Sequence, residues 1–196
     1  LSTILDLVNR RLPSFNSKWS KIWDIQVLSP TRKGLLGVDN LNNEIQAILN
    51  PSSKDKKEKQ VRDIVFREGD KVMQIKNNYS LEWHRIGGDG ENKGVGVFNG
   101  DMGYIETIDE ERKVLSVVFD DERRVIYEFM FLDELELAYA ITIHKSQGSE
   151  FKVVVMPTFM GSAFLMNRNI LYTGITRAKE LVVVVGNQKS HHQLCH

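Results

Sequence analysis

The spacing of hydrophobic positions changes twice along the chain and divides it into three segments. Residues 1–64 combine helically spaced apolar positions at 1–12 with a short apolar run at 25–28 that is typical of a buried strand. Residues 65–134 alternate apolar and polar positions, which favours short strands. Residues 135–196 return to buried strands and helices. The pattern predicts an α/β domain that is interrupted by an antiparallel insertion.

The first segment is expected to hold two helices. Ser2 or Thr3 can cap the first helix, and Pro13 is expected to end it because proline has no backbone N–H. Asp39 or Asn40 can cap the second helix, since both side chains accept hydrogen bonds from free backbone N–H groups.

The middle segment predicts a small antiparallel barrel, because four or five short apolar runs are separated by turn signals. The charged residues 51–60, just before it, are expected to be an exposed loop, with contact to DNA phosphates as the alternative. The Gly-rich residues 79–97 are expected to be a long mobile loop of the barrel. The expected strands lie at residues 69–75, 104–108, 114–119 and 124–129.

The last segment places a polar loop, Thr142–Gly148, between the end of one strand and the buried strand 152–156. Such loops are where α/β proteins bind their ligands. A helix at about 165–173, a short helix at 176–178 and a strand at 181–185 are expected to follow.

Composition excludes few classes of function. With 196 residues, 41% of them hydrophobic and 27% charged, the chain is globular and can hold one ordinary domain or two small ones. Its formal net charge is zero, so nucleic-acid binding requires a local basic surface. The single cysteine, Cys195, fits a reducing cytoplasm, and neither a membrane-spanning run nor a signal peptide is visible. The chain begins with Leu1, as a piece of a longer protein would.

Three stretches resemble motifs of superfamily 1 helicases, in the family's order. Residues 138–151, AYAITIHKSQGSEF, resemble motif V in the form found in the RecD/TraA branch, which includes the alpha subunit of exodeoxyribonuclease V. Residues 171–186, LYTGITRAKELVVVVG, resemble motif VI. Residues 24–34, DIQVLSPTRKG, resemble the motif IV region, with LN at 41–42 and LNP at 49–51 in the following helix.

The resemblance implies the second RecA-like motor domain of a DNA helicase. This is a P-loop NTPase-type α/β fold, with a parallel sheet, helices on both faces and an inserted SH3-like antiparallel β-barrel. The expected boundaries are 1–64 and 135–196 for the two parts of the RecA-like domain and 65–134 for the barrel.

The resemblance assigns four residues to the nucleotide. Arg177 and Arg32, in the motif VI and motif IV matches, would be catalytic arginines at the γ-phosphate, where a permanently charged, planar guanidinium stabilises developing charge. Glu150 would accept hydrogen bonds from the ribose, and Gly148 would allow close backbone approach. Without the resemblance, an arginine such as Arg177 would more commonly be an exposed residue near the start of a helix. Glu150 would be a carboxylate of a loop or helix start without effect on stability or function.

Seven residues are the expected contacts to single-stranded DNA. Five of them are small or polar donors on one loop, which suits phosphate contacts, and two lie in the barrel, where an exposed ring can stack on a base. For His144 the alternative is a structural role. For Trp83, which lies close to Tyr79 in the sequence, the alternative is packing on the barrel. No spacing of cysteine and histidine indicates a metal site. The seven are Thr142, His144, Lys145, Ser146, Gln147, Asn78 and Tyr79.

No G-x-x-x-x-G-K-S/T phosphate-binding sequence occurs in the chain. The resemblance therefore implies that ATP and Mg²⁺ bind together with a preceding RecA-like domain, and that this chain alone binds neither and does not hydrolyse ATP. The implied partners are single-stranded DNA, that preceding domain and exodeoxyribonuclease V-type subunits, with translocation from 5′ to 3′. The rival hypothesis is a non-catalytic DNA- or protein-binding scaffold in an exodeoxyribonuclease V-like or conjugative relaxase complex.

Overall fold

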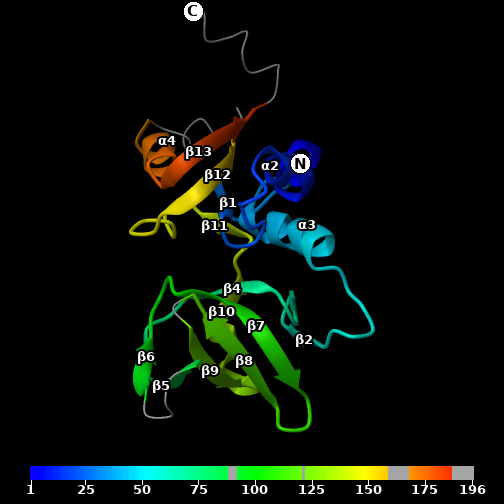
Figure 1. Ribbon diagram of the computed structural model, residues 1–196, viewed down its shortest axis with the longest axis vertical. Coiled ribbons are helices and arrows are strands. Elements are labelled where there is room, and N and C mark those ends of the chain that lie inside the picture. Colours follow the sequence, from blue (N-terminus) through cyan, green and yellow to red (C-terminus); the bar gives the residue numbers. More distant parts are fainter. Residues whose placement is uncertain (88–91, 121, 159–167, 187–196) are drawn as a thin grey trace, which may run out of the picture. The chain divides into compact units, whose positions relative to one another are not determined.

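The chain divides into two compact units (Figure 1). One is built on a parallel sheet and the other on antiparallel strands, which confirms the expected α/β fold with an antiparallel insertion. The computed structural model describes residues 1–87, 92–120, 122–158 and 168–186. The first unit is Leu1–Leu49 with Tyr139–His196, and the second is Asn50–Ala138.

Within the described residues, the sheet of the first unit has four parallel strands. In sheet order they are β11 (Ala140–Thr142), β1 (Ile25–Ser29), β12 (Phe151–Pro157) and β13 (Ala178–Val185). Every residue of β1 is buried, as are all but one of β12, which is typical of parallel strands that are covered on both faces.

The N-terminal helical segment continues through Pro13, so the expected end at this proline was wrong. It consists of α1 (Ser2–Asp6), the π-helical turn η1 (Leu7–Arg11) and α2 (Leu12–Phe15). A π turn widens the hydrogen-bonding pattern of the backbone, and here it comes directly before the proline that lacks a donor.

The other helix starts also differ from the expected ones. Leu1 occupies the N-cap of α1, just ahead of the two polar residues that were expected there. The helix α3 (Val38–Leu49) begins before Asp39 and Asn40, which therefore lie in its first turn. An acidic residue in the first turn is favourable because it faces the positive end of the helix dipole.

Helix α4 (Arg168–Ile175) leads into the last strand. The expected start of this helix near residue 165 lies outside the described residues. Residues 176–177 form a turn and β13 begins at Ala178, so the expected short helix at 176–178 was wrong. Figure 1 shows α4 on one side of the parallel sheet and the N-terminal helices with α3 on the other.

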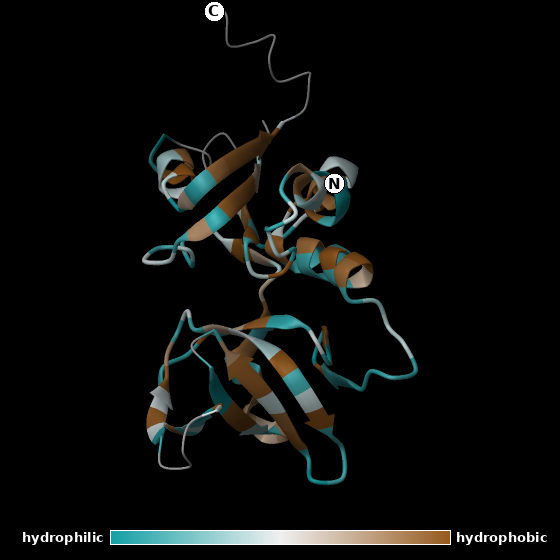
Figure 2. Cartoon of the chain, in the orientation of Figure 1, coloured by the Kyte–Doolittle hydropathy of each residue, from teal (hydrophilic) through white to brown (hydrophobic). Residues whose placement is uncertain are grey.

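The second unit has a seven-stranded sheet in the order β10-β4-β7-β8-β9-β5-β6, in which neighbouring strands are antiparallel, and a separate β2–β3 hairpin. Figure 2 shows the alternation of hydrophobic and hydrophilic bands along its strands. The strands are β2 (Glu58–Val61), β3 (Ile64–Arg67), β4 (Lys71–Gln74), β5 (Asn78–Arg85), β6 (Lys93–Val97), β7 (Met102–Asp109), β8 (Val114–Phe119), β9 (Arg123–Glu128) and β10 (Leu135–Leu137), with the 3-10 helix η2 (Phe129–Glu134) before β10.

Two hairpins include residues that were expected to lie in loops, namely most of 79–97 and the last three residues of the charged segment 51–60. Residues 79–97 lie largely in β5 and β6, with Trp83 packed against Gly94, where an added Cβ would lie 2.5 Å from the indole ring. Residues 58–67 form the β2–β3 hairpin, whose Phe66 is fully buried. Because this hairpin packs with the antiparallel strands, the second unit begins at Asn50 and ends at Ala138, whereas the sequence placed its limits at residues 65 and 134.

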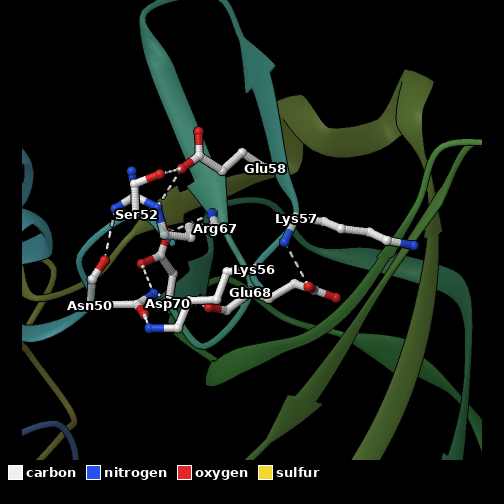
Figure 3. Close-up of polar contacts among 8 residues, drawn as sticks. All are labelled: Asn50, Ser52, Lys56, Lys57, Glu58, Arg67, Glu68 and Asp70. Atoms are coloured by element: carbon white, nitrogen blue, oxygen red, sulfur yellow. Dashed lines mark hydrogen bonds and ion pairs between the residues drawn. The ribbon is translucent and has the colours of Figure 1, made fainter. Parts of the chain in front are cut away.

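A polar cluster holds the start of the second unit in place (Figure 3). The Asn50 side chain, with only 4% of the residue exposed, donates from Nδ2 to Asp70 Oδ1 at 2.8 Å and accepts from Lys56 Nζ at 2.6 Å. Arg67 Nη1 donates to the Asn50 carbonyl at 2.7 Å, and Arg67 Nε donates to Glu58 Oε1 at 2.7 Å. We refer to these five residues as the Asn50 cluster.

Two carboxylates in this region also accept hydrogen bonds from backbone N–H groups. Asp70 Oδ2 accepts from the Arg67 N–H at 2.7 Å, and the two carboxylate oxygens of Glu68 accept from the N–H groups of Lys57 and Ile108. The hydrogen bonds from Ser52 and Arg67 hold the pKa of the Glu58 carboxyl below its usual value. The cluster therefore fastens the hairpin and the first residues of the unit to the antiparallel strands.

Candidate nucleotide and nucleic-acid site

The polar loop that comes after β11 is a series of tight turns, as the sequence predicted. The N–H of Ile143 donates to the Ser29 carbonyl, and Ser146 N–H donates to Thr142 O at 3.2 Å. The loop closes at Gly148, whose φ of +84° lies in the left-handed region that favours glycine. A Cβ at Gly148 would meet no atom within 4 Å, so the backbone here is open to close approach by a ligand.

The five predicted DNA contacts of this loop differ in how they are placed. His144 and Gln147 are exposed, and Lys145 is half-buried. Thr142 is half-buried and its hydroxyl accepts from the Lys145 N–H at 3.1 Å. Ser146 is fully buried and its hydroxyl donates to the Ile143 carbonyl, so the hydroxyl holds the loop in this structure, and its expected DNA contact stays a prediction.

The residues predicted to bind the nucleotide lie where β12 and β13 begin. Phe151 is opposite Ala178 in the sheet, and the Phe151 N–H donates to the Arg177 carbonyl at 2.8 Å. This pairing brings Glu150 and Arg177 together at the amino ends of β12 and β13, since each is the residue just before its strand. Glu150 is exposed and pairs with Lys179 Nζ at 3.6 Å, a surface contact of little energetic weight.

The guanidinium of Arg177 is only partly engaged. Nη1 lies 3.4 Å from the Ser149 carbonyl and Nη2 lies 3.3 Å from the Thr176 hydroxyl, both at the long end of hydrogen-bonding distance. Within the part of the chain that the structure describes, its buried Nε has no hydrogen-bond partner. An arginine donor that is buried without a partner is unusual in folded proteins.

Arg32 lies at the opposite end of the parallel strands from Arg177. It comes after the carboxyl end of β1, whereas Arg177 precedes the amino end of β13, and these strands are parallel to the β12 between them. Arg32 Nη2 contacts Asp39 Oδ1 at 3.3 Å, while Lys33 Nζ contacts the other oxygen of the same carboxylate at 2.8 Å. The structure therefore groups Gly148, Glu150 and Arg177, and it leaves Arg32 near the start of the polar loop.

The two predicted barrel contacts also behave differently. Asn78 donates from Nδ2 to both carboxylate oxygens of Glu134 at 3.1 Å, so its amide is used inside the unit. Tyr79 is 71% exposed, and its ring meets Phe98, itself 42% exposed, edge to face at 5.6 Å between centroids. Phe98 was not among the residues predicted from the sequence. A turn-flanking aromatic beside Asn99-Gly100 was the available signal.

The described residues show neither a metal-binding group of side chains nor a membrane-spanning helix. Among the described residues, no group of histidine, cysteine, aspartate and glutamate is arranged to hold a metal ion. None of the helices in the described ranges has the length and apolar character that crossing a membrane requires.

Comparison with known families matches two successive parts of the chain. Residues 41–119 match the family described as the ATP-dependent RecD-like DNA helicase SH3 domain. Residues 137–185 match the UvrD-like helicase C-terminal domain. The two matches succeed one another along the chain, in agreement with the motif order seen in the sequence.

Curated relatives extend these matches over most of the chain. The ATP-dependent RecD2 DNA helicase of Deinococcus radiodurans is 34% identical over 163 residues, which are 83% of this chain and 20% of that protein. The RecBCD enzyme subunit RecD of Buchnera aphidicola is 28% identical over 174 residues, 84% of this chain and 25% of that protein. The chain thus spans a quarter or less of the length of these two relatives.

A solved structure supports the fold. A Pif1 helicase from Bacteroides, in complex with ADP-AlF3 and single-stranded DNA, superimposes with a TM-score of 0.52 at 20% identity, covering 94% of this chain and 45% of that one. At this identity the likeness concerns the fold alone.

Proposed function

We propose, because the chain belongs to the RecD-like helicases, that it is the C-terminal motor half of an ATP-dependent DNA helicase. ATP and Mg²⁺ would bind in the full-length protein, with a preceding RecA-like domain supplying the phosphate-binding sequence that this chain lacks. The half-motor alone would not hydrolyse ATP. Its work in the whole protein would be translocation and unwinding of DNA in recombination and repair, in the cytoplasm.

The observation that supports this proposal best is the position of Arg177. Its backbone is fixed by the pairing of β12 with β13, while its buried Nε has no partner among the described residues. A fixed backbone with an unsatisfied guanidinium suits a group that stabilises charge on a phosphate. Arg177 is thus our candidate for the arginine finger, with Gly148 and Glu150 beside it for the nucleotide.

The DNA contacts are assigned to the exposed and half-buried polar side chains of the loop. His144, Lys145 and Gln147 would contact phosphates, as would Thr142 at the start of the loop. Ser146 would stabilise the loop through its hydrogen bond to the Ile143 carbonyl. Arg32, proposed from the sequence as a second catalytic arginine, lies at the end of the strands where this loop begins. We therefore expect Arg32 to contribute less than Arg177 to ATP hydrolysis. Translocation from 5′ to 3′ rests on the resemblance to the RecD/TraA branch only.

The first test is binding of single-stranded DNA to this chain by fluorescence anisotropy at low and raised salt. We expect salt-sensitive binding that Lys145→Ala weakens, with the slope of affinity against salt reduced by about one. Lys18→Ala, an exposed lysine of the connector before β1, is the matched control and should bind as wild type. Binding that is equally weak in both variants would contradict the assignment of the loop.

The second test concerns Arg177 and uses the full-length helicase. Arg177→Ala should lower the ATP turnover number by about 10³-fold or more while ATP binding persists, because the lost interaction forms mainly in the transition state. Arg32→Ala in the same protein should have a much smaller effect on turnover. Equal losses in the two variants would show that the separation of the two arginines across the sheet does not matter in the assembled motor.

A second candidate function rests on the exposed rings of Tyr79 and Phe98. Two neighbouring exposed aromatic side chains can stack on unpaired bases. The second unit would then bind single-stranded DNA without ATP, as a scaffold in an exodeoxyribonuclease V-like or relaxase complex. DNA affinity that falls in Tyr79→Ala and is unchanged in Lys145→Ala would favour this scaffold function.

A further inference from the structure

Among the described residues, the strand that precedes the polar loop pairs with another strand on one side only. β11 has three residues and is the outermost strand of the parallel sheet, paired with β1 through Val27–Ala140, Leu28–Ile141 and Ser29–Thr142. A short edge strand has free backbone groups on its outer side and little to fix its register. Something else must keep Thr142 at the position from which the loop starts.

Asn42 of helix α3 supplies the missing partner. Its Nδ2 donates to the Ala140 carbonyl at 3.0 Å, and its Oδ1 accepts from the Ala140 N–H at 2.8 Å. The residue is 6% exposed. One side-chain amide therefore exchanges two hydrogen bonds with one residue, as two opposite residues of antiparallel strands do.

A second buried amide holds the preceding residue. Gln26, fully buried in β1, donates from Nε2 to the Tyr139 carbonyl at 3.1 Å. Tyr139 is the residue with which the chain returns to the first unit. The returning chain is thus fixed at two consecutive residues by amides from two different elements.

The position of Ala140 determines the position of the loop residues after it. A shift of the β11 register by one residue would break both bonds to Asn42 and turn every side chain of the strand to the opposite face. Thr142 would then lose the orientation in which its hydroxyl accepts from the Lys145 N–H. The geometry of the loop therefore depends on a side chain that lies outside it.

We infer that Asn42 is a positioning residue for the polar loop, because its amide sets the register of β11 and thereby the placement of residues 142–147, which include the proposed DNA contacts. This inference rests on the function proposed for that loop. Asn42 itself is buried and contacts no DNA. It acts through Ala140.

The test compares Asn42→Asp with wild type in this chain. The aspartate keeps an acceptor for the Ala140 N–H but places an anionic oxygen against the Ala140 carbonyl. Hydrogen exchange of the backbone at residues 139–147 should become about tenfold faster, as for a strand whose local opening costs about 1.4 kcal/mol less. Single-stranded DNA affinity should fall about tenfold, while exchange in the second unit stays as in wild type.

Two further variants keep the test decisive. Asn40→Ala removes a hydrogen bond to Leu35 from the same helix without touching β11, and both readouts should match wild type. Asn42→Gln retains an amide on a longer side chain that cannot make both bonds to Ala140, so it should also speed exchange, and it replaces Asn42→Asp if that variant does not fold.

The outcomes separate this inference from the proposed function. Unchanged exchange at residues 139–147 in folded Asn42→Asp and Asn42→Gln overturns the inference, whatever the DNA binding shows. Faster exchange with unchanged DNA affinity also overturns it, because the loop would not depend on the register of β11. If wild type binds no DNA, the DNA contact proposed for this chain fails, and the exchange measurement still decides whether Asn42 sets the register of β11.

Discussion

The Asn50 cluster and the Thr142–Gly148 loop are both dense in polar side chains, yet they use those side chains in opposite ways. In the cluster, amide, guanidinium and carboxylate groups bind one another at 2.6–2.8 Å. In the loop, two hydroxyls are turned to the backbone and the larger polar groups of His144 and Gln147 face solvent. Polar density alone therefore does not mark a binding site. A site is marked by polar groups that the fold positions and does not satisfy.

Arg67 and Arg177 show the same contrast for one residue type. Arg67 has strong bonds from Nε to Glu58 and from Nη1 to the Asn50 carbonyl, and its side chain is 11% exposed. Arg177 has two long contacts and a buried Nε without a partner among the described residues. Satisfied buried arginines stabilise a fold, whereas a positioned and unsatisfied one can bind an anion.

Asp70→Ala should have the largest effect on the cluster. Asp70 is fully buried and accepts from the Asn50 side chain and from the Arg67 N–H, so its loss leaves buried donors without partners. The free energy of unfolding of the second unit should fall by about 3 kcal/mol. Urea unfolding of the chain measures this.

The control for Asp70 is Asp55→Ala, which changes an exposed aspartate of the neighbouring segment. It should stay within about 0.5 kcal/mol of wild type. Equal stabilities of the two variants would show that the cluster is only a surface network. DNA binding through the loop should be unchanged in both folded variants.

Tyr127 extends the comparison to a buried hydroxyl of the second unit. It is fully buried and donates to Gln74 Oε1 at 2.7 Å, and burial raises the pKa of its hydroxyl far above the ordinary value. The neutral form is thus favoured in the folded state. Its contribution is fully present below the unfolded-state pKa of about 10, and it is lost as pH rises above that value.

Tyr127→Phe should therefore cost about 1 kcal/mol at neutral pH, because Gln74 loses its donor. The gap to wild type should then shrink by up to about 1.4 kcal/mol per pH unit above about pH 10, since only wild type has this proton to lose on unfolding. Urea unfolding at neutral and alkaline pH measures the gap. A gap that does not change with pH would contradict the prediction.

The sequence predicted the hydrophobic framework well, because burial follows local spacing. The strands around Val27, Val117 and Val154 lie where apolar runs placed them. The Tyr79–Val97 region was missed as a hairpin because its glycines indicated a loop, while its pairing with β9 depends on residues far along the chain, such as Val125 opposite Trp83.

The candidate site was predictable only in part for a similar reason. The motifs identified Arg177 and the polar loop, since these lie in continuous stretches. The burial of Ser146, the amide of Asn42 on β11 and the separation of Arg32 from Arg177 are set by three-dimensional pairing. No local pattern distinguishes a serine that holds a loop from one that faces a ligand.

Ser146→Ala and Gln147→Ala should separate these two kinds of loop residue. Ser146→Ala removes the buried hydroxyl that bonds the Ile143 carbonyl, and it should lower the free energy of unfolding by about 1 kcal/mol. Gln147→Ala changes an exposed side chain and should stay within about 0.5 kcal/mol of wild type while weakening DNA binding. If Ser146→Ala alone reduces DNA affinity without any loss of stability, the burial of its hydroxyl does not decide its role.

Glu58 should give the smallest effect and tests whether even the rim of the cluster is satisfied internally. Hydrogen bonds from Ser52 and Arg67 lower the pKa of its carboxyl from an ordinary value of 4.5, so the stabilisation is present above that value and is lost as pH falls through the lower folded-state pKa. The side chain is 34% exposed, and solvent screening limits the effect to about a few tenths of a kcal/mol. Glu58→Gln should therefore unfold at slightly lower urea than wild type at neutral pH, and the difference should vanish in acid, as the pH falls through the lowered folded-state pKa of Glu58. Glu44→Gln, at a half-buried position of α3 outside the cluster, is the control and should unfold at the same urea concentration as wild type at neutral pH. A Glu58 difference that persists undiminished in acid would mean that the side chain stabilises the unit by packing and not by its charge.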